Sequence, residues 1–237
     1  MPGYRLVSSE LDKVLIYDKN GHIAGMHSIV PVSATNPDLY DYTKSGWYRN
    51  TTIDDVDYYM TTAYFIHPTK ICNEGRTAEE VDVEGTLSSQ LYFQVGETID
   101  DLLEAPMTFD QANETAWWFE QNCFPNMGIH FNLIDPDDAP TISCTDIPSF
   151  AQLIYHQGNL HAFQWFHVFS FAGIIPEGTT LEEWLVVNPW EPVSQAIVNI
   201  IAKTPVACLM GDDGIIETIG INSQHVYLRD WETIGCN

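Results

Sequence analysis

The chain has 237 residues, of which 45% are apolar and 12% aromatic, so it can bury a full hydrophobic core and is not intrinsically disordered. Nine basic residues stand against 33 acidic ones, which gives a formal net charge of −24. A surface this acidic repels phosphate backbones, so we expect no nucleic acid partner. No apolar run approaches the length that spans a bilayer, and we therefore expect no membrane insertion.

The first half of the chain predicts strands joined by turns. Residues 13–32 contain two apolar runs on either side of Asp18-Lys-Asn-Gly21, and Asn-Gly between such runs is the strongest short signal for a β-hairpin. The segment 56–68 predicts a strand closed by its final proline, and the segment 86–96 predicts another closed by its final glycine.

The second half mixes helical and strand patterns. Apolar residues at helical spacing predict a helix over 108–122, with Thr108 as its N-cap, and a second helix over 192–204. Strands are expected in segments 128–134, 150–173 and 223–231, with a turn at Gln157-Gly-Asn159 and a hairpin around Asp212-Asp-Gly214. We therefore expect one α+β domain spanning residues 1–237, a mainly antiparallel β barrel or sandwich with two or three helices.

The five cysteines are widely spaced and form no CxxC pair that would indicate a zinc or redox centre: Cys72, Cys123, Cys144, Cys208 and Cys236. In a secreted protein they would form two disulfides and leave one thiol, whereas in a cytosolic protein they would be small core residues. The start of the chain shows no signal peptide, which fits either a cytosolic protein or a mature secreted one whose leader is absent from this chain. The acidity and the position of Cys236, one residue from the end, favour an extracellular protein.

Several motifs occur together in a characteristic order. The most specific are Cys-Phe-Pro-Asn-Met-Gly-Ile-His-Phe at 123–131 and Ser-Gln-His-Val-Tyr-Leu at 223–228. As a set, these motifs make the chain resemble a family of uncharacterised secreted animal proteins. The resemblance implies a single extracellular domain, and it implies no activity.

Eight histidines raise the question of a metal site. None of them form the i, i+2 pair that a strand needs or the i, i+3 or i, i+4 pair that a helix needs, so a site would have to be assembled from distant segments. The best candidates are His67, His130 and His225, each at the start or end of a strand beside a proline, a glycine or a polar turn. They would hold zinc or copper in a metal-dependent enzyme, or each would be a hydrogen-bonded structural histidine.

The segment 160–171 offers a different kind of site. Strand alternation predicts that His161, Phe163, Trp165 and His167 lie on one side of a central strand covered on both faces. These side chains would line a pocket for a small, largely apolar molecule, with a histidine as the polar contact, or they would simply pack in the core.

Three hypotheses for function follow. The leading one is a secreted acidic protein that binds a small, largely apolar molecule in this aromatic-lined pocket. The first alternative is the zinc or copper enzyme, and the second is a structural or interaction protein of an extracellular fluid or matrix. Nucleophilic catalysis has little support, because the chain has no Gly-x-Ser-x-Gly elbow.

Overall fold

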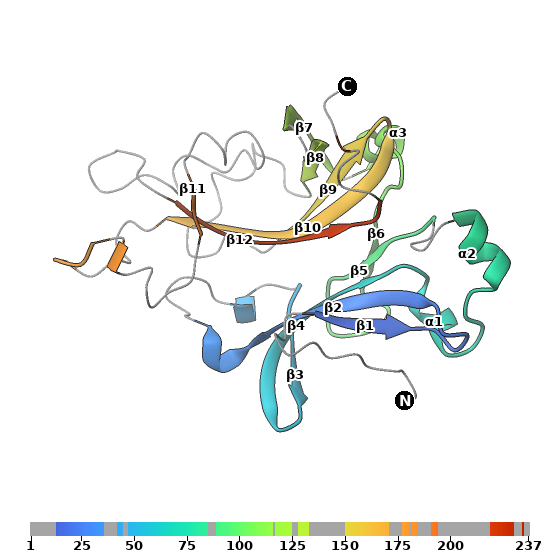
Figure 1. The fold of residues 1–237 in the computed structure, drawn as a ribbon, viewed down its shortest axis with the longest axis horizontal. Coiled ribbons are helices and arrows are strands. Elements are labelled where there is room, and N and C mark those ends of the chain that lie inside the picture. Colours follow the sequence, from blue (N-terminus) through green and yellow to red (C-terminus); the bar gives the residue numbers. More distant parts are fainter. Residues whose placement is uncertain are drawn as a thin grey trace. The chain divides into compact units, whose positions relative to one another are not determined.

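The computed structural model describes residues 13–35, 42–44, 47–84, 89–115, 117–124, 128–132, 150–170, 177–180, 182–183, 191–193, 219–229 and 234. By its contacts the chain divides into two compact units, residues 1–36 with 42–107, and residues 37–41 with 108–237. Each unit carries one antiparallel sheet (Figure 1), which confirms the expected mainly antiparallel α+β class. Among the described strands neither sheet closes into a barrel. The expectation of a single domain stays a prediction.

The sheet of the first unit has the strand order β1-β2-β4-β5-β6, with β3 paired to β4. Its strands are β1 (Lys13–Tyr17), β2 (Ile23–Pro31), β3 (Arg49–Ile53), β4 (Val56–Tyr64), β5 (Tyr92–Gln94) and β6 (Leu102–Glu104). The helical elements of this unit are η1 (Val32–Ala34), η2 (Tyr42–Lys44), α1 (Pro68–Ile71) and α2 (Ala78–Glu84). The strands expected in 13–32 and 56–68 are thus confirmed, and the one expected in 86–96 is reduced to the three residues of β5.

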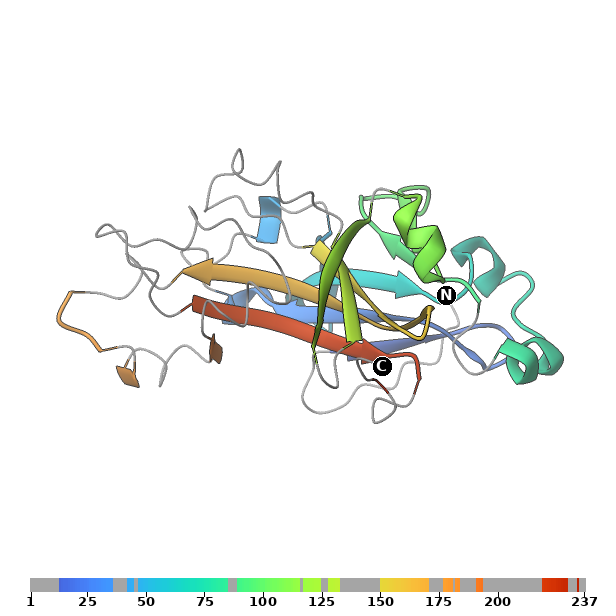
Figure 2. The ribbon, with the colours of Figure 1, turned by 90° about the horizontal axis from the view of Figure 1, so that it is seen from above.

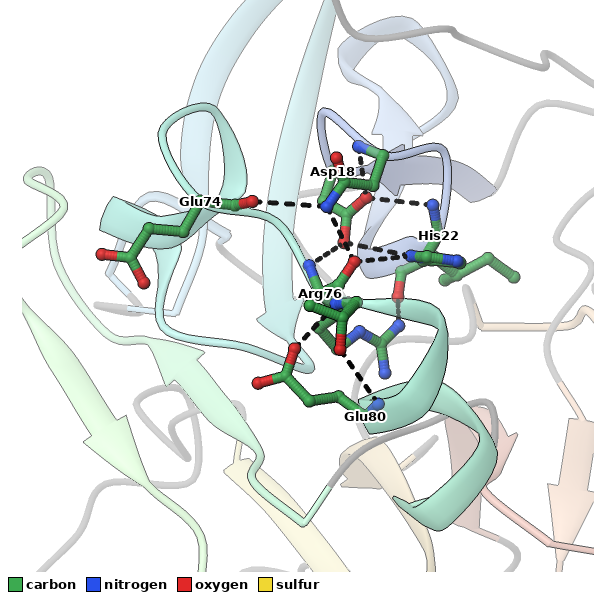
Figure 3. A network of polar contacts seen from close by, with 8 residues as sticks. Asp18, His22, Glu74, Arg76 and Glu80 are labelled. Atoms are coloured by element: carbon green, nitrogen blue, oxygen red, sulfur yellow. Dashed lines mark hydrogen bonds and ion pairs between the residues drawn. The ribbon is translucent and has the colours of Figure 1, made fainter.

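The turn between β1 and β2 is tied to the loop before α2 by one buried carboxylate (Figure 3). Oδ1 of Asp18 accepts the backbone N–H groups of Asn20 at 2.9 Å and His22 at 3.0 Å. Oδ2 accepts the backbone N–H of Arg76 at 2.7 Å. The hairpin predicted at Asp18-Lys-Asn-Gly21 is therefore confirmed, and its aspartate does more than shape a turn.

The sheet of the second unit has the strand order β11-β12-β10-β9-β8-β7. Its strands are β7 (Trp118–Phe124), β8 (Gly128–Asn132), β9 (Phe150–His156), β10 (Asn159–Ser170), β11 (Glu191–Val193) and β12 (Ile219–Tyr227). The turn predicted between β9 and β10 is confirmed, with positive φ angles of 49° at Gln157 and 78° at Gly158. Such left-handed pairs match the twist of the flanking strands, and the glycine adopts one without steric cost.

The helix predicted over 108–122 is wrong for most of its length. The structure has only α3 (Phe109–Asn113), after which the chain enters β7. The predicted N-cap is confirmed, because Thr108 and Gln111 form a capping box. Helical periodicity continued into the aromatic run that begins at Trp117, but pairing with β8 overrides it there, and large aromatic residues suit a strand equally well.

The second predicted helix, 192–204, overlaps a strand at its start, since Glu191–Val193 pairs with β12 as β11. The remainder of that helix and the hairpin predicted around Asp212-Asp-Gly214 lie outside the described residues. In the part of the chain that the structure describes, no helix is long and apolar enough to cross a membrane.

One side of the second sheet, here called the apolar face, is packed with large buried side chains. They are Phe131, Leu153, Tyr155, Phe163 and Trp165. Phe109 of α3 covers this face, with its ring centroid 5.2 Å from that of Phe131 and 6.3 Å from that of Tyr155. Edge-to-face aromatic contacts of this kind add to the stabilisation that burial provides. The opposite side, here called the polar face, carries buried amide side chains.

Candidate functional site

The polar face of the second sheet carries a row of four polar side chains across four adjacent strands. In the strand register Asn132 lies opposite Gln152, and Gln152 lies opposite Gln164. Gln164 in turn lies opposite His225. Directly opposed residues project from the same side of a sheet, so these four side chains share one face. We call these four side chains, three amides and one histidine, the amide row.

The three amides form a hydrogen-bonded chain in one direction. Nε2 of Gln164 donates to Oε1 of Gln152, and Nε2 of Gln152 donates to Oδ1 of Asn132 at 2.5 Å. All three residues are buried, and Oε1 of Gln164 has no hydrogen-bond partner. A buried acceptor without a donor costs about 1–3 kcal/mol of folding free energy. Oε1 of Gln164, at the end of this series of hydrogen bonds, is such an acceptor.

His130 lies on the same face, one row along from Asn132 on β8. Its side chain is 0% exposed, and neither ring nitrogen makes a hydrogen bond that meets standard geometry. Burial, and secondarily the nearby His225, lower the pKa of His130 to about 3, and the backbone of Gly128 offsets only part of this. At neutral pH the ring is therefore an uncharged imidazole with one donor and one acceptor nitrogen.

The second sheet is strongly twisted between β8 and β12. In a flat sheet about 14 Å would separate β8 from β12, three strand spacings away. His225 on β12 nevertheless lowers the pKa of His130 on β8. Figure 1 and Figure 2 show β7 and β8 turned steeply across the direction of β10 and β12. The second sheet is thus strongly twisted, and His225 on its polar face lies near enough to His130 to act on the pKa of that ring.

The polar face reaches solvent at β12. His225 is half-buried, its Nε2 has no hydrogen-bond partner, and burial lowers its pKa. Its ring stacks on that of Tyr227 with centroids 6.0 Å apart, and Tyr227 is 38% exposed. Solvent exposure thus increases along this face from His130, which is fully buried, to Tyr227, which is exposed.

The Met-Gly-Ile-His part of the 123–131 motif positions His130 through its glycine. Gly128 has a φ of +72°, and a Cβ added there would lie 2.6 Å from the carbonyl oxygen of Tyr155 and 3.2 Å from Cγ2 of Ile234. Only glycine allows β8 to begin this close to β9. Two residues further along β8, the side chain of His130 lies on the polar face.

The aromatic-lined pocket predicted on β10 is not supported by the contacts of its residues, and it stays a prediction. Phe163 and Trp165 are 0% and 2% exposed and meet edge to face at 5.3 Å, as core residues do. A register shift between Leu160 and Ala162 takes His161 out of the strand alternation. The side chain of His167 lies outside what the structure describes, although its backbone pairs with Asn222 on β12.

The ring of His161 lies beside that of another histidine, His156, at the end of the β9–β10 hairpin. Its ring lies 5.0 Å from the ring of His156, and burial, followed by His156 and Arg229, lowers its pKa to about 4. Nδ1 of His161 has no hydrogen-bond partner. The shift in register, which no sequence pattern signalled, therefore pairs two histidines at the end of the β9–β10 hairpin.

The three predicted metal ligands divide between the units. His130 and His225 lie on the polar face of the second unit, and His67 belongs to the first unit. His67 precedes α1, where its Nδ1 lies 2.7 Å from Oγ1 of Thr69 and its ring meets that of Tyr92 edge to face at 5.4 Å. Among the described residues, no group of three His, Cys, Asp or Glu side chains is arranged to hold a metal ion.

A surface cavity of about 440 Å³ lies on the first unit, beside the β3–β4 hairpin. It is lined by Val32, Asn50, Thr51, Thr52, Asp57, Tyr58 and Tyr59. None of the side chains predicted from the sequence to bind a ligand or a metal lines it.

A scan of protein-family models, a search of curated proteins and a search of solved structures found no match to this chain. The resemblance to secreted animal proteins therefore stays a prediction. The amide row was missed from the sequence although it left a signal there, an amide side chain flanked by apolar residues in each of three strand segments.

Proposed function

We propose that the protein binds a small, largely apolar molecule on the polar face of the second sheet. The observation that carries this proposal is a set of buried polar atoms on one face that have no hydrogen-bond partner among the described residues: both ring nitrogens of His130, Oε1 of Gln164 and Nε2 of His225. Such atoms are rare in folded proteins, and each is a position where a ligand group can form a hydrogen bond. Ile154 and Ala162, also buried on this face, provide the apolar surroundings.

The polar groups of the ligand are expected to be uncharged. Both His130 and His225 have lowered pKa values because they are buried, so neither offers a positive charge at neutral pH. Oε1 of Gln164 accepts hydrogen bonds, and a ligand hydroxyl or amide N–H would donate to it. An apolar molecule with one or two hydroxyl or amide groups meets these requirements.

The test uses Nile red, an uncharged apolar dye whose emission rises in apolar surroundings, with 1-dodecanol as competitor. Two adjacent residues on opposite faces of β10 provide matched variants, Gln164→Met on the polar face and Trp165→Phe on the apolar face. We expect the wild type and Trp165→Phe to bind the dye and release it to dodecanol. Gln164→Met should lose most of the competition by dodecanol, because it removes the acceptor for the hydroxyl group.

If Trp165→Phe alone lost the competition by dodecanol, the ligand would instead bind at the aromatic side chains predicted from the sequence. Equal binding by all three proteins would contradict a site on either face of β10. No binding at all would leave the structural or interaction protein as the better hypothesis. Far-UV circular dichroism and urea titration of each variant exclude loss of fold as the cause.

A second candidate function is metal binding, favoured by the approach of two uncharged imidazoles with unpaired nitrogens. His130 and His225 would each supply one nitrogen to zinc or copper, which imidazole ligands suit. Elemental analysis by mass spectrometry, before and after a chelator, distinguishes the two proposals. About one metal ion per chain in the wild type and none in His130→Phe would support the metal site, whereas no metal in either protein would contradict it.

We further propose that the protein is extracellular. The excess of acidic residues supports this location, as does Cys123 on β7, which is disulfide-bonded. Disulfides persist in oxidising compartments and are rare in the cytosol. Recovery of the full-length natural protein from the medium, and not from the cell lysate, is the expected result.

A further inference from the structure

The first sheet contains a half-buried arginine whose hydrogen-bond partners are all uncharged. Arg49 on β3 lies opposite Met60 of β4, so its side chain shares a face with Thr62, two residues further along that strand. His27 of β2 lies opposite Thr62 and projects from the same face. Three adjacent strands thus bring a guanidinium, a hydroxyl and an imidazole together.

The hydrogen bonds among these groups determine which of their protons remain available. Nη2 of Arg49 donates to Oγ1 of Thr62, and this hydroxyl lies 2.8 Å from Nδ1 of His27. Burial, followed by Arg49, lowers the pKa of His27 to about 4, so the imidazole is neutral at pH 7. In the tautomer in which the hydroxyl of Thr62 donates to Nδ1, the single ring proton of His27 lies on Nε2.

The other hydrogen-bond partner of Arg49 among the described residues is also neutral. Tyr64 is hydrogen-bonded to Arg49, and its hydroxyl donates to Oε1 of Gln94 at 3.0 Å. Gln94 is held in turn by the carbonyl of Thr98, which accepts from its Nε2 at 2.9 Å. The arginine is therefore fixed by a chain of groups that carry no charge.

The guanidinium keeps one donor unused. Nε of Arg49 is buried and makes no hydrogen bond. Within the described residues no carboxylate forms an ion pair with Arg49, although the exposed Glu97 acts on its pKa from a distance. Buried charges in folded proteins are normally paired, so a cation held only by neutral groups is suited to an anion from outside the chain.

We propose that Arg49 and His27 form a binding site for the carboxylate of a small organic acid, with Nε–H of Arg49 and Nε2–H of His27 as donors. One positive charge with neutral neighbours matches a monoanion better than a phosphate, which carries nearly two charges at neutral pH. A guanidinium recognises the planar carboxylate through directed N–H donors. The site lies in the first unit and does not depend on the function proposed for the second.

The test follows the side-chain Nε–Hε signals of the arginines by ¹⁵N NMR in the full chain, titrated with sodium butyrate. The sequence has four arginines, Arg5, Arg49, Arg76 and Arg229, so the signals are few and Arg49→Lys assigns the one that matters. Butyramide is the uncharged control of the same shape, and sodium chloride and sodium phosphate control for ionic strength and for anions in general. Arg229→Met is the matched variant at an exposed arginine.

We expect a saturable shift of the Arg49 signal with butyrate and none with butyramide. Affinity for butyrate should fall at least about tenfold in Arg49→Lys, which keeps the charge but loses the Nε–H donor, and should be unchanged in Arg229→Met. An equal response to chloride or phosphate would mean an adventitious ion only and would overturn the proposal, as would the absence of any shift with butyrate. If the lysine variant does not fold, the contacts of the Arg49 side chain with Thr62 and Tyr64 assign its signal in the wild type, and the wild-type titrations decide between these outcomes.

Discussion

The backbone N–H of Arg76 donates a hydrogen bond to Oδ2 of Asp18 across 2.7 Å, although 58 residues separate the two in the chain. The same carboxylate accepts two further backbone N–H groups through Oδ1. One fully buried aspartate therefore fixes the first hairpin and joins it to the loop before α2 (Figure 3). Its removal would leave these three backbone N–H groups, one of them buried and two partly buried, without their acceptor.

Two substitutions at this position separate the contributions of the two oxygens. Asp18→Asn keeps one acceptor oxygen and should lower the free energy of unfolding by about 2 kcal/mol, because one charge-assisted bond is lost. Asp18→Ala removes both oxygens and should cost about 3–5 kcal/mol. Urea denaturation followed by circular dichroism measures both values.

Asp100→Ala is the control for these variants, since Asp100 is exposed and its carboxylate accepts no hydrogen bond among the described residues. It should change the free energy of unfolding by no more than about 0.5 kcal/mol. If Asp18→Ala were as stable as this control, the network around Arg76 would not contribute to stability.

Gly128 and Gly21 form a natural pair for testing how the 123–131 motif works. Both have positive φ, 72° and 87°, but an added Cβ at Gly21 meets nothing within 4 Å, while at Gly128 it meets the carbonyl oxygen of Tyr155 at 2.6 Å. Gly21→Ala should cost about 1 kcal/mol for the left-handed backbone alone. Gly128→Ala should cost at least about 2 kcal/mol more, because β8 must move away from β9. Equal losses in the two variants, measured by urea denaturation, would show that crowding at Gly128 is relieved without displacing the strand.

Local signals in the sequence predicted the elements that depend on local chemistry. Asn-Gly marked the β1–β2 turn, and Thr108 marked the start of α3, because turn geometry and helix capping involve neighbouring residues. The length of α3 was wrong because β7 forms by pairing with β8, a contact between separate segments. The apolar pattern before Asn122 does not distinguish a continued helix from a strand.

The candidate site shows the same limit. His130 and His225 were predicted as site residues from their positions at strand ends, and both lie on the polar face. The amides of Gln152 and Gln164 were overlooked, because a single polar residue in an apolar strand gains meaning only when the register places it opposite another. Register is set by pairing between strands, and the displacement of His161 likewise results from an irregularity in that pairing.

Cysteine chemistry gives a prediction that bears on the cellular location. Cys72 is exposed and free, and Cys123 is disulfide-bonded. Two disulfides require that the remaining three cysteines, like Cys123, are all oxidised, so native protein should react with one equivalent of iodoacetamide, at Cys72. Peptide mapping by mass spectrometry, with and without prior reduction, gives the number and position of labelled thiols. Labelling of three or more cysteines in the native protein would contradict the form with two disulfides.

The burial of His130 makes the stability of the protein depend on pH in a defined direction. Its pKa is about 3 in the folded protein, against an ordinary value of 6.5, which the unfolded chain recovers. Between these values the unfolded state binds the proton and the folded state does not, so acid favours unfolding. The stabilisation is complete above about pH 6.5 and decreases as the pH falls towards 3, by about 1.4 kcal/mol per pH unit for this group.

His130→Phe isolates this contribution, because phenylalanine fills a similar volume and cannot be protonated. At pH 7 we expect the variant to be close to the wild type in stability, since it removes two unpaired nitrogens along with the ring. Between pH 7 and pH 5 the wild type should lose about 2 kcal/mol more than the variant. His27 and His161, whose pKa values are also lowered by burial, act in the same direction in both proteins and cancel in the comparison. Parallel pH profiles from urea denaturation would mean that His130 is protonated, or solvated, in the folded protein, and would remove the main support for a ligand site built on its uncharged ring.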